Sequence, residues 1–159
     1  MADFIWRAVV IGLAATAVID LWALVLKRAF GIPPANWAMV GRWFGHLPRG
    51  TVVHADIAKA EPIANELALG WLCHYAVGIL FAAATLVLAG PAWRLAPTPA
   101  WPLVVGLVTV GCGWFILQPG MGAGIAASRR PNAGQIRALN IVSHTVFGLA
   151  MFAAAWAIR

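Results

Sequence analysis

Four apolar stretches run along the chain, separated by polar or Pro/Gly-rich segments. They cover about residues 8–26, 67–89, 101–118 and 138–158, and the second contains no charged residue. A helix needs roughly 20 apolar residues to cross a hydrocarbon core about 30 Å thick. In lipid, every backbone polar group must be satisfied within the segment itself. The pattern therefore predicts an all-α, four-span transmembrane bundle that forms a single membrane domain over residues 1–159.

The connection between the first two spans, residues 27–66, is too long for a simple turn. Asn36 is a good helix N-cap, and four apolar residues after it recur with helical spacing: Trp37, Val40, Phe44 and Leu47. Arg42 and Arg49 are available for lipid headgroups. This pattern is typical of a short interfacial helix lying flat on the membrane.

The third span ends in Gln118-Pro119-Gly120, where proline is expected to kink or break the helix. Gly120 and Gly124 are spaced as a small-xxx-small pair, which predicts the close approach of a neighbouring helix.

The two halves of the chain share a pattern. His74 and Gly78 in the second span match His144 and Gly148 in the fourth, and an alanine triplet follows each pair. Two hairpins of the same orientation would be related by a pseudo-twofold axis along the membrane normal. Residues at i and i+4 share a helix face, so each imidazole is expected beside a notch where helices pack.

Composition and charge narrow the class of protein. Hydrophobic residues make up 62% of the chain and charged residues only 10%, against about 25% charged residues in soluble domains. The net charge of +6 would suggest nucleic acid binding in a soluble protein, but the basic residues here lie between apolar runs, so we expect contact with lipid and no binding of nucleic acid.

Eight basic residues lie in the first and third connections: Lys27, Arg28, Arg42, Arg49, Lys59, Arg129, Arg130 and Arg137. Three lie on the other side: Arg7, Arg94 and Arg159. The positive-inside rule then puts both connections in the cytoplasm and both termini outside it.

Each predicted span carries one polar side chain near its cytoplasmic end. Asp20, His74 and His144 lie roughly 9 to 10 Å inside that end at 1.5 Å per residue, and Gln118 lies at the end of its span. Such residues face the interior of a bundle, where ligand and metal sites are built. We expect this layer to bind a metal or small ligand or to relay protons.

Several alternatives are open for this layer. Imidazole and carboxylate groups suit a transition metal, and the candidate ligands are His74, His144, Asp20, His54 and His46. A bis-histidine haem b between the second and fourth spans is another candidate, and a purely structural hydrogen-bond cluster is a third. The chain also fits an accessory or scaffold subunit that packs against other membrane subunits or a second copy of itself. G-x-S-x-G, P-loop and H-E-x-x-H motifs are missing, so whether the protein is an enzyme stays open.

Four blocks carry a resemblance to a known family: Gly41–Gly50, Ala68–Tyr75, Gln118–Arg129 and His144–Gly148. Together they resemble the bacterial integral-membrane family catalogued as domain of unknown function 2938. The resemblance covers nearly the whole chain and implies a four-span protein of the bacterial inner membrane. It implies no activity.

Overall fold

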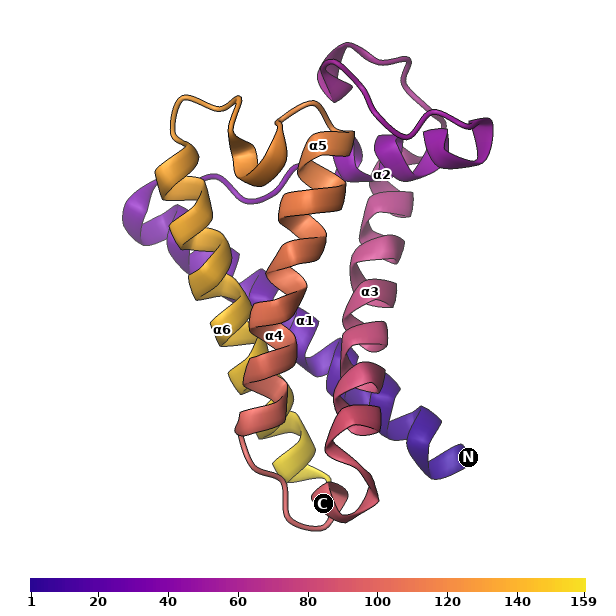
Figure 1. Ribbon diagram of the computed structural model, residues 1–159, viewed down its shortest axis with the longest axis vertical. Helices are drawn as coiled ribbons and strands as arrows, with labels where there is room; N and C mark the ends of the chain where they lie inside the picture. The colour runs from indigo at the N-terminus through magenta and orange to yellow at the C-terminus, as the bar shows by residue number, and fades with distance from the viewer. The chain divides into compact units, whose positions relative to one another are not determined.

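The computed structural model describes all 159 residues, and all its regular structure is helical (Figure 1). Four helical segments are long and apolar enough to cross a membrane. They are α1 (Ala2–Phe30), α3 (Glu66–Ala89), the continuous run α4, η4 and α5 (Ala100–Gly120), and α6 (Ala133–Ala157). The prediction of an all-α, four-span protein is confirmed. α1 and α6 begin several residues before the predicted stretches, because their first turns mix polar or charged residues with apolar ones, among them Asp3 in α1 and Gln135 in α6.

The shorter elements lie in the connections. They are α2 (Trp37–His46), η1 (Leu47–Arg49), η2 (Ile57–Lys59), η3 (Pro91–Arg94) and η5 (Ile125–Ala127). The predicted cap is confirmed, since the Asn36 side chain accepts a hydrogen bond from the Met39 amide at 3.4 Å. The prediction that Arg42 reaches lipid headgroups is wrong. Its side chain is buried because it forms an ion pair with Glu66 at the start of α3.

The residues form two compact units, which we describe separately. The hairpin unit contains Met1–Pro34, Tyr75–Thr109 and Ile141–Arg159, and the connection unit contains Ala35–His74 and Val110–Asn140. Most of α1, α3, α4 and α6 belongs to the hairpin unit. The connection unit contains α2, the first turns of α3, and the segment around η4 and α5.

Glycines set both helix crossings in the hairpin unit. α1 meets α3 at Gly12 and Gly78, where a Cβ on Gly12 would lie 2.5 Å from the Ile79 Cα. α4 meets α6 at Gly106 and Gly148, where a Cβ on Gly148 would lie 2.8 Å from the Pro102 carbonyl oxygen. In Figure 1, α1 crosses obliquely behind α3, and α4 runs beside α6. The notch expected beside His74, at Gly78, is therefore filled by the Thr16 side chain and the Gly12 carbonyl of α1, and the notch beside His144, at Gly148, by the backbone of α4.

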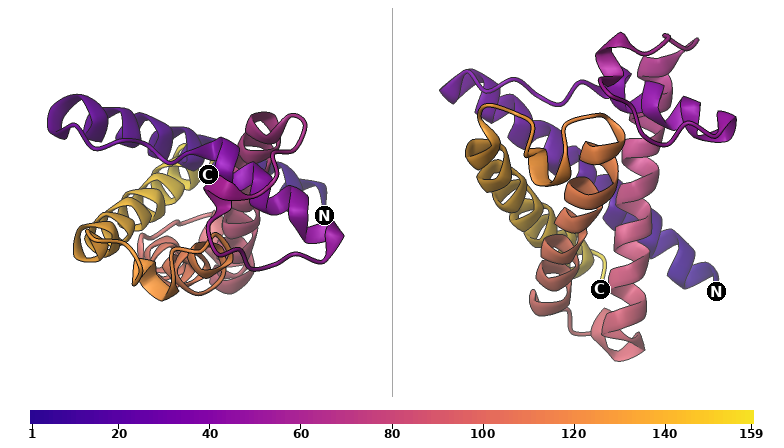
Figure 2. Two further views of the ribbon diagram at one scale, coloured as in Figure 1. Left: turned by 90° about the horizontal axis from the view of Figure 1, so that it is seen from above. Right: turned by 45° about the horizontal axis from the view of Figure 1, so that its top comes forward.

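In the connection unit, α2 lies across the first turns of α3 (Figure 2), with Gly41 packed against Gly70.

The third span departs from α-helical geometry before its proline. η4 (Gly113–Leu117) is a π-helical turn between α4 (Ala100–Cys112) and α5 (Gln118–Gly120). Proline has no amide hydrogen to donate four residues back, which weakens the helical ladder at this point. The break expected at Pro119 therefore takes the form of a widened turn followed by the helix end.

Gly120 and Gly124 do not form a shared helix face. The helix ends at Gly120, which packs against the Trp43 indole ring. Gly124 lies in the following loop with a φ of 76° and faces Ser128 and Arg129 of that loop. The expected spacing is lost because the chain leaves the helix between the two glycines.

Candidate functional site

In the hairpin unit, the carboxylate of Asp20 on α1 is bound by the phenol of Tyr75 on α3. The Tyr75 hydroxyl donates to Asp20 Oδ2 at 2.8 Å, and both side chains are half-buried. A carboxylate at the centre of a membrane helix costs about 2.5 to 3.5 kcal/mol on insertion scales, and the cost is smaller at the depth of Asp20, between the centre and the end of its span. Such residues mark ion or proton paths more often than packing positions. This acid–phenol pair is the most chemically capable contact in the hairpin unit.

His144 on α6 is held in one tautomer by α4. Its Nδ1 lies 2.9 Å from the Gly106 carbonyl oxygen and 3.3 Å from Thr109 Oγ1. The Thr109 hydroxyl has acceptors of its own in the Val105 and Gly106 carbonyls. Because a carbonyl oxygen only accepts, His144 Nδ1 carries a proton and Nε2 is the basic nitrogen of the neutral ring.

His74 and Gln118 belong to the connection unit. The His74 ring stacks on Trp37 of α2, with centroids 3.9 Å apart, and meets the edge of Trp71 at 5.8 Å. The Trp114 indole nitrogen and Gln118 Nε2 each donate to Asn140 Oδ1 at 3.0 Å. An indole nitrogen can only donate, which fixes the orientation of both amides. Of the predicted polar layer, then, Asp20 and His144 lie in the hairpin unit and His74 and Gln118 in the connection unit.

Arg42 organises much of the connection unit. Its Nε and Nη2 donate to the two carboxylate oxygens of Glu66 at 2.8 Å each. Its Nη1 donates to three carbonyl oxygens of the connection, those of Ile57, Ala58 and Ala60. The hydrogen bonds to Glu66 raise the pKa of Arg42 above its ordinary value. A single guanidinium thus ties α2 to α3 and fixes the path of the chain between them.

His46 and His54 also lie in the connection unit, where both side chains are buried. His46 Nδ1 is 2.8 Å from His54 Nε2. The outer nitrogens each meet a carbonyl oxygen, His46 Nε2 that of Glu61 at 3.0 Å and His54 Nδ1 that of Gly120 at 3.1 Å. The two imidazoles therefore form a chain between two backbone carbonyls.

The structure gives no support to a metal centre. No group of three or more His, Cys, Asp or Glu side chains is arranged to hold a metal ion. Both nitrogens of His46 and of His54, and Nδ1 of His144, already have hydrogen-bond partners. Gly78 is packed against the Thr16 side chain of α1 and Gly148 against the backbone of α4, so neither glycine opens a space for a haem ring between the helices.

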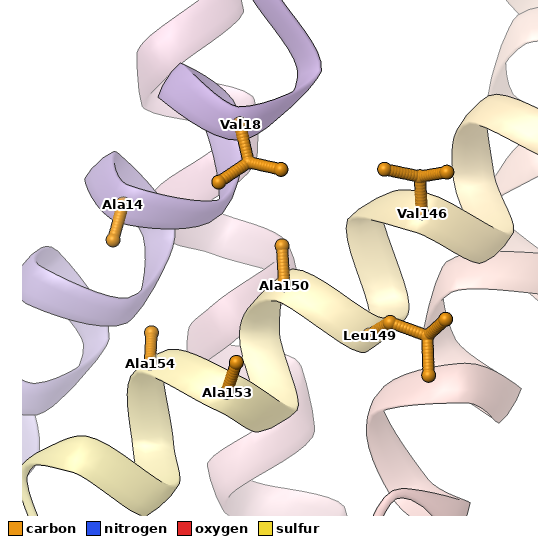
Figure 3. A pocket seen from close by; sticks show the side chains of 7 residues that line it. All are labelled: Ala14, Val18, Val146, Leu149, Ala150, Ala153 and Ala154. Atoms are coloured by element: carbon orange, nitrogen blue, oxygen red, sulfur yellow. The ribbon is translucent and has the colours of Figure 1, made fainter. Parts of the chain in front are cut away.

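The groove between α1 and α6 has no chemistry of its own. It has a volume of about 430 Å³, and its lining is apolar (Figure 3): Ala14, Val18, Val146, Leu149, Ala150, Ala153 and Ala154. None of these side chains titrates or donates a hydrogen bond. We therefore place the candidate chemistry at the Asp20–Tyr75 pair.

Sequence patterns did not single out Tyr75, Glu66 or Asn140. Tyr75 is the only tyrosine in the chain and directly follows His74. The position of a phenol hydroxyl within a predicted membrane span was the one sequence feature that could have pointed to it. Glu66 stands at the end of the polar connection, and no local pattern pairs it with Arg42. Asn140 lies near the start of the fourth span, and its role depends on Trp114 and Gln118 from another helical segment.

The fold and these contacts define a small multi-pass membrane protein with acidic, phenolic and imidazole groups on or beside its spans. The chain belongs to the family described as "Protein of unknown function (DUF2938)", whose model matches residues 9–158. No curated protein and no solved structure matches it.

Proposed function

We propose that this protein relays protons within the membrane and that Asp20, assisted by Tyr75, is the group that binds the transferred proton. The observation that carries the proposal is the 2.8 Å hydrogen bond from the Tyr75 hydroxyl to Asp20 Oδ2. A proton relay needs neither a group of three metal ligands, which the structure does not bring together, nor an open notch at Gly78 or Gly148, both of which pack against a neighbouring helix. A carboxylate with a phenol as its partner can carry out proton transfer with no cofactor.

The chemistry requires that Asp20 exist in two states. When ionised, the carboxylate is stabilised by the phenol hydrogen bond, which is stronger to a charged acceptor than to a neutral one. When protonated, the carboxyl group becomes a donor and no charge remains in the span. His144 Nε2, the basic nitrogen on α6 in the same unit, is a second candidate acceptor.

We expect purified protein in liposomes to carry protons when a membrane potential is imposed, and Asp20→Asn to abolish this flux. Asparagine keeps the shape of aspartate, but its side-chain amide does not take up a proton as a carboxylate does. Tyr75→Phe removes one hydrogen bond to Asp20 and is expected to slow proton transfer about tenfold. A trapped pH-sensitive dye reports the flux.

Asp3→Asn is the matched control, since Asp3 is also on α1 but lies exposed in ion pairs with Arg7 and Arg94. Its flux is expected to equal that of the unaltered protein. A flux no higher than in protein-free liposomes would overturn the proposal. A protein that is inactive but copurifies with membrane partners at a fixed ratio would instead favour a scaffold subunit.

We also propose that the chain lies in a bacterial inner membrane with both termini on the non-cytoplasmic side. The eight basic residues of the first and third connections support this orientation through the positive-inside rule. An alkaline phosphatase fused after Arg159 is expected to be active, since the enzyme works only outside the cytoplasm, and one fused after Arg130 inactive. The reverse pattern would contradict the orientation.

A further inference from the structure

The two buried imidazoles of the connection unit make three contacts in a row. From one end these are Glu61 carbonyl to His46 Nε2, His46 Nδ1 to His54 Nε2, and His54 Nδ1 to Gly120 carbonyl, at 3.0, 2.8 and 3.1 Å. Each contact is short enough for a hydrogen bond, and each needs one proton between its two atoms. The chain of contacts therefore requires three N–H protons.

Two neutral imidazoles supply only two protons. With both protons on the outer nitrogens, two bare nitrogens face each other at 2.8 Å. With one proton moved between the rings, one outer nitrogen is left bare against a carbonyl oxygen. Two fully protonated rings fail differently, because they place two N–H groups and two positive charges against each other. Only the state with three protons satisfies every contact.

We propose that His46 and His54 form a proton-binding site that holds one shared proton at neutral pH, so that the pair carries a single positive charge. The site lies in the connection unit and does not depend on the proposed role of Asp20. Its shared proton joins His46, the last residue of α2, to His54 in the connection, and His54 is itself held at the end of α5, where its backbone amide donates to the Gly120 carbonyl at 2.9 Å. Occupancy of the site thus completes a row of hydrogen bonds from α2 through the connection to the end of the third span.

No carboxylate among the surrounding charged groups forms a hydrogen bond with either ring, although the charge of the Glu66 carboxylate acts on His46. On α2, Arg42 is paired with Glu66 of α3. In the connection, Glu61 offers its backbone carbonyl to His46. Asp56 uses its side chain to cap η2 through the Ala58 amide. The α5 segment, Gln118–Gly120, carries no charged side chain.

A route for proton exchange is present beside His54. A surface hollow of about 390 Å³ is lined by His54, Ala55, Asp56, Lys59 and Ala60. Asp56 and Lys59 at its edge are groups that exchange protons with water. His46 lies behind His54 and is reached through the shared hydrogen bond. The site is therefore buried yet connected to the aqueous side through one of its two rings.

The unaltered protein, with its histidines labelled by ¹⁵N, gives the direct test by NMR in detergent. At about pH 7, three of the four nitrogens of the pair are expected to be of the N–H type and one bare or exchanging. A scalar coupling between His46 Nδ1 and His54 Nε2 would identify the shared proton. Two bare nitrogens would overturn the proposal, as would four N–H groups. Because the chain has only four histidines, the signals lost in His74→Asn and in His144→Asn identify those two rings, and the remaining signals belong to the pair.

Stability against pH gives a second readout. Above about pH 7, unfolded histidines are neutral, so a folded pair that keeps its proton binds one more proton than the unfolded chain. The unfolding constant should then rise about tenfold per pH unit, because stability falls with pH when the folded state binds the extra proton. His54→Gln is expected to lose this slope, whereas His74→Asn is expected to keep it. Equal slopes for these two variants would contradict the proposal.

Discussion

Replacing Arg42 with methionine is expected to destabilise the protein by about 3 kcal/mol, because it leaves a half-buried carboxylate without its partner. Methionine keeps much of the side-chain volume, so the loss reports hydrogen bonds and charge more than packing. Glu66 loses two hydrogen bonds of 2.8 Å, and the carbonyls of Ile57, Ala58 and Ala60 lose their common donor. Unfolding of the purified protein in mixed detergent micelles measures the effect.

Arg49→Met is the matched control, since Arg49 is exposed in the turn after α2 and is expected to change stability by less than about 0.5 kcal/mol. The double variant Arg42→Met with Glu66→Gln should recover part of the loss, because it removes the unpaired charge. Equal stability of Arg42→Met and Arg49→Met would show that the ion pair does not hold the connection.

Gly70→Ala is expected to have an effect of similar size, through packing alone. A Cβ at this position would collide with the Trp37 carbonyl, and one on Gly41 with the Glu66 carbonyl. Both obstacles are backbone atoms, which cannot rotate away as a side chain can. Overpacking of this kind costs about 1 to 3 kcal/mol, and more where the backbone must shift. The loss should appear in the same unfolding experiment.

The indole fluorescence of Trp37 and Trp71 should also change in Gly70→Ala, since both rings lie beside His74 at the crossing of α2 and α3. Gly134→Ala is the matched control because a Cβ on Gly134 meets no atom within 4 Å. It is expected to be neutral or to stabilise α6 by up to about 1 kcal/mol, since alanine is the better helix former. If the two alanine variants were equally stable, the close crossing would be absent in solution.

The spans could be predicted from sequence because their requirement is local. A stretch of apolar residues long enough to cross lipid must form a helix, whatever it packs against. The Asn36 cap was predictable for the same reason, since its hydrogen bond reaches only three residues ahead. The prediction for Gly124 was wrong because spacing presumes a continuous helix, and the chain leaves the helix after Gly120.

The partner of Arg42 could not be predicted from local sequence patterns. The position of Arg42 on an apolar helix suggested a headgroup contact, but its partner Glu66 is 24 residues away. The same holds for His46 and His54. From the sequence they were only candidate metal ligands in a long connection, and only folding brings their rings within hydrogen-bond distance of each other, between the carbonyls of Glu61 and Gly120.

The sequence by itself determined that this is a four-span helical membrane protein and which polar residues lie on its spans. Those properties follow from the free energy of moving each segment from water to lipid, which depends on composition and length. Only the tertiary structure decided the partner of each polar group: Tyr75 for Asp20, Gly106 for His144, Glu66 for Arg42 and His54 for His46. A hydrogen bond depends on distance and direction between atoms far apart in the chain, and the packing of helices at their glycine crossings sets both.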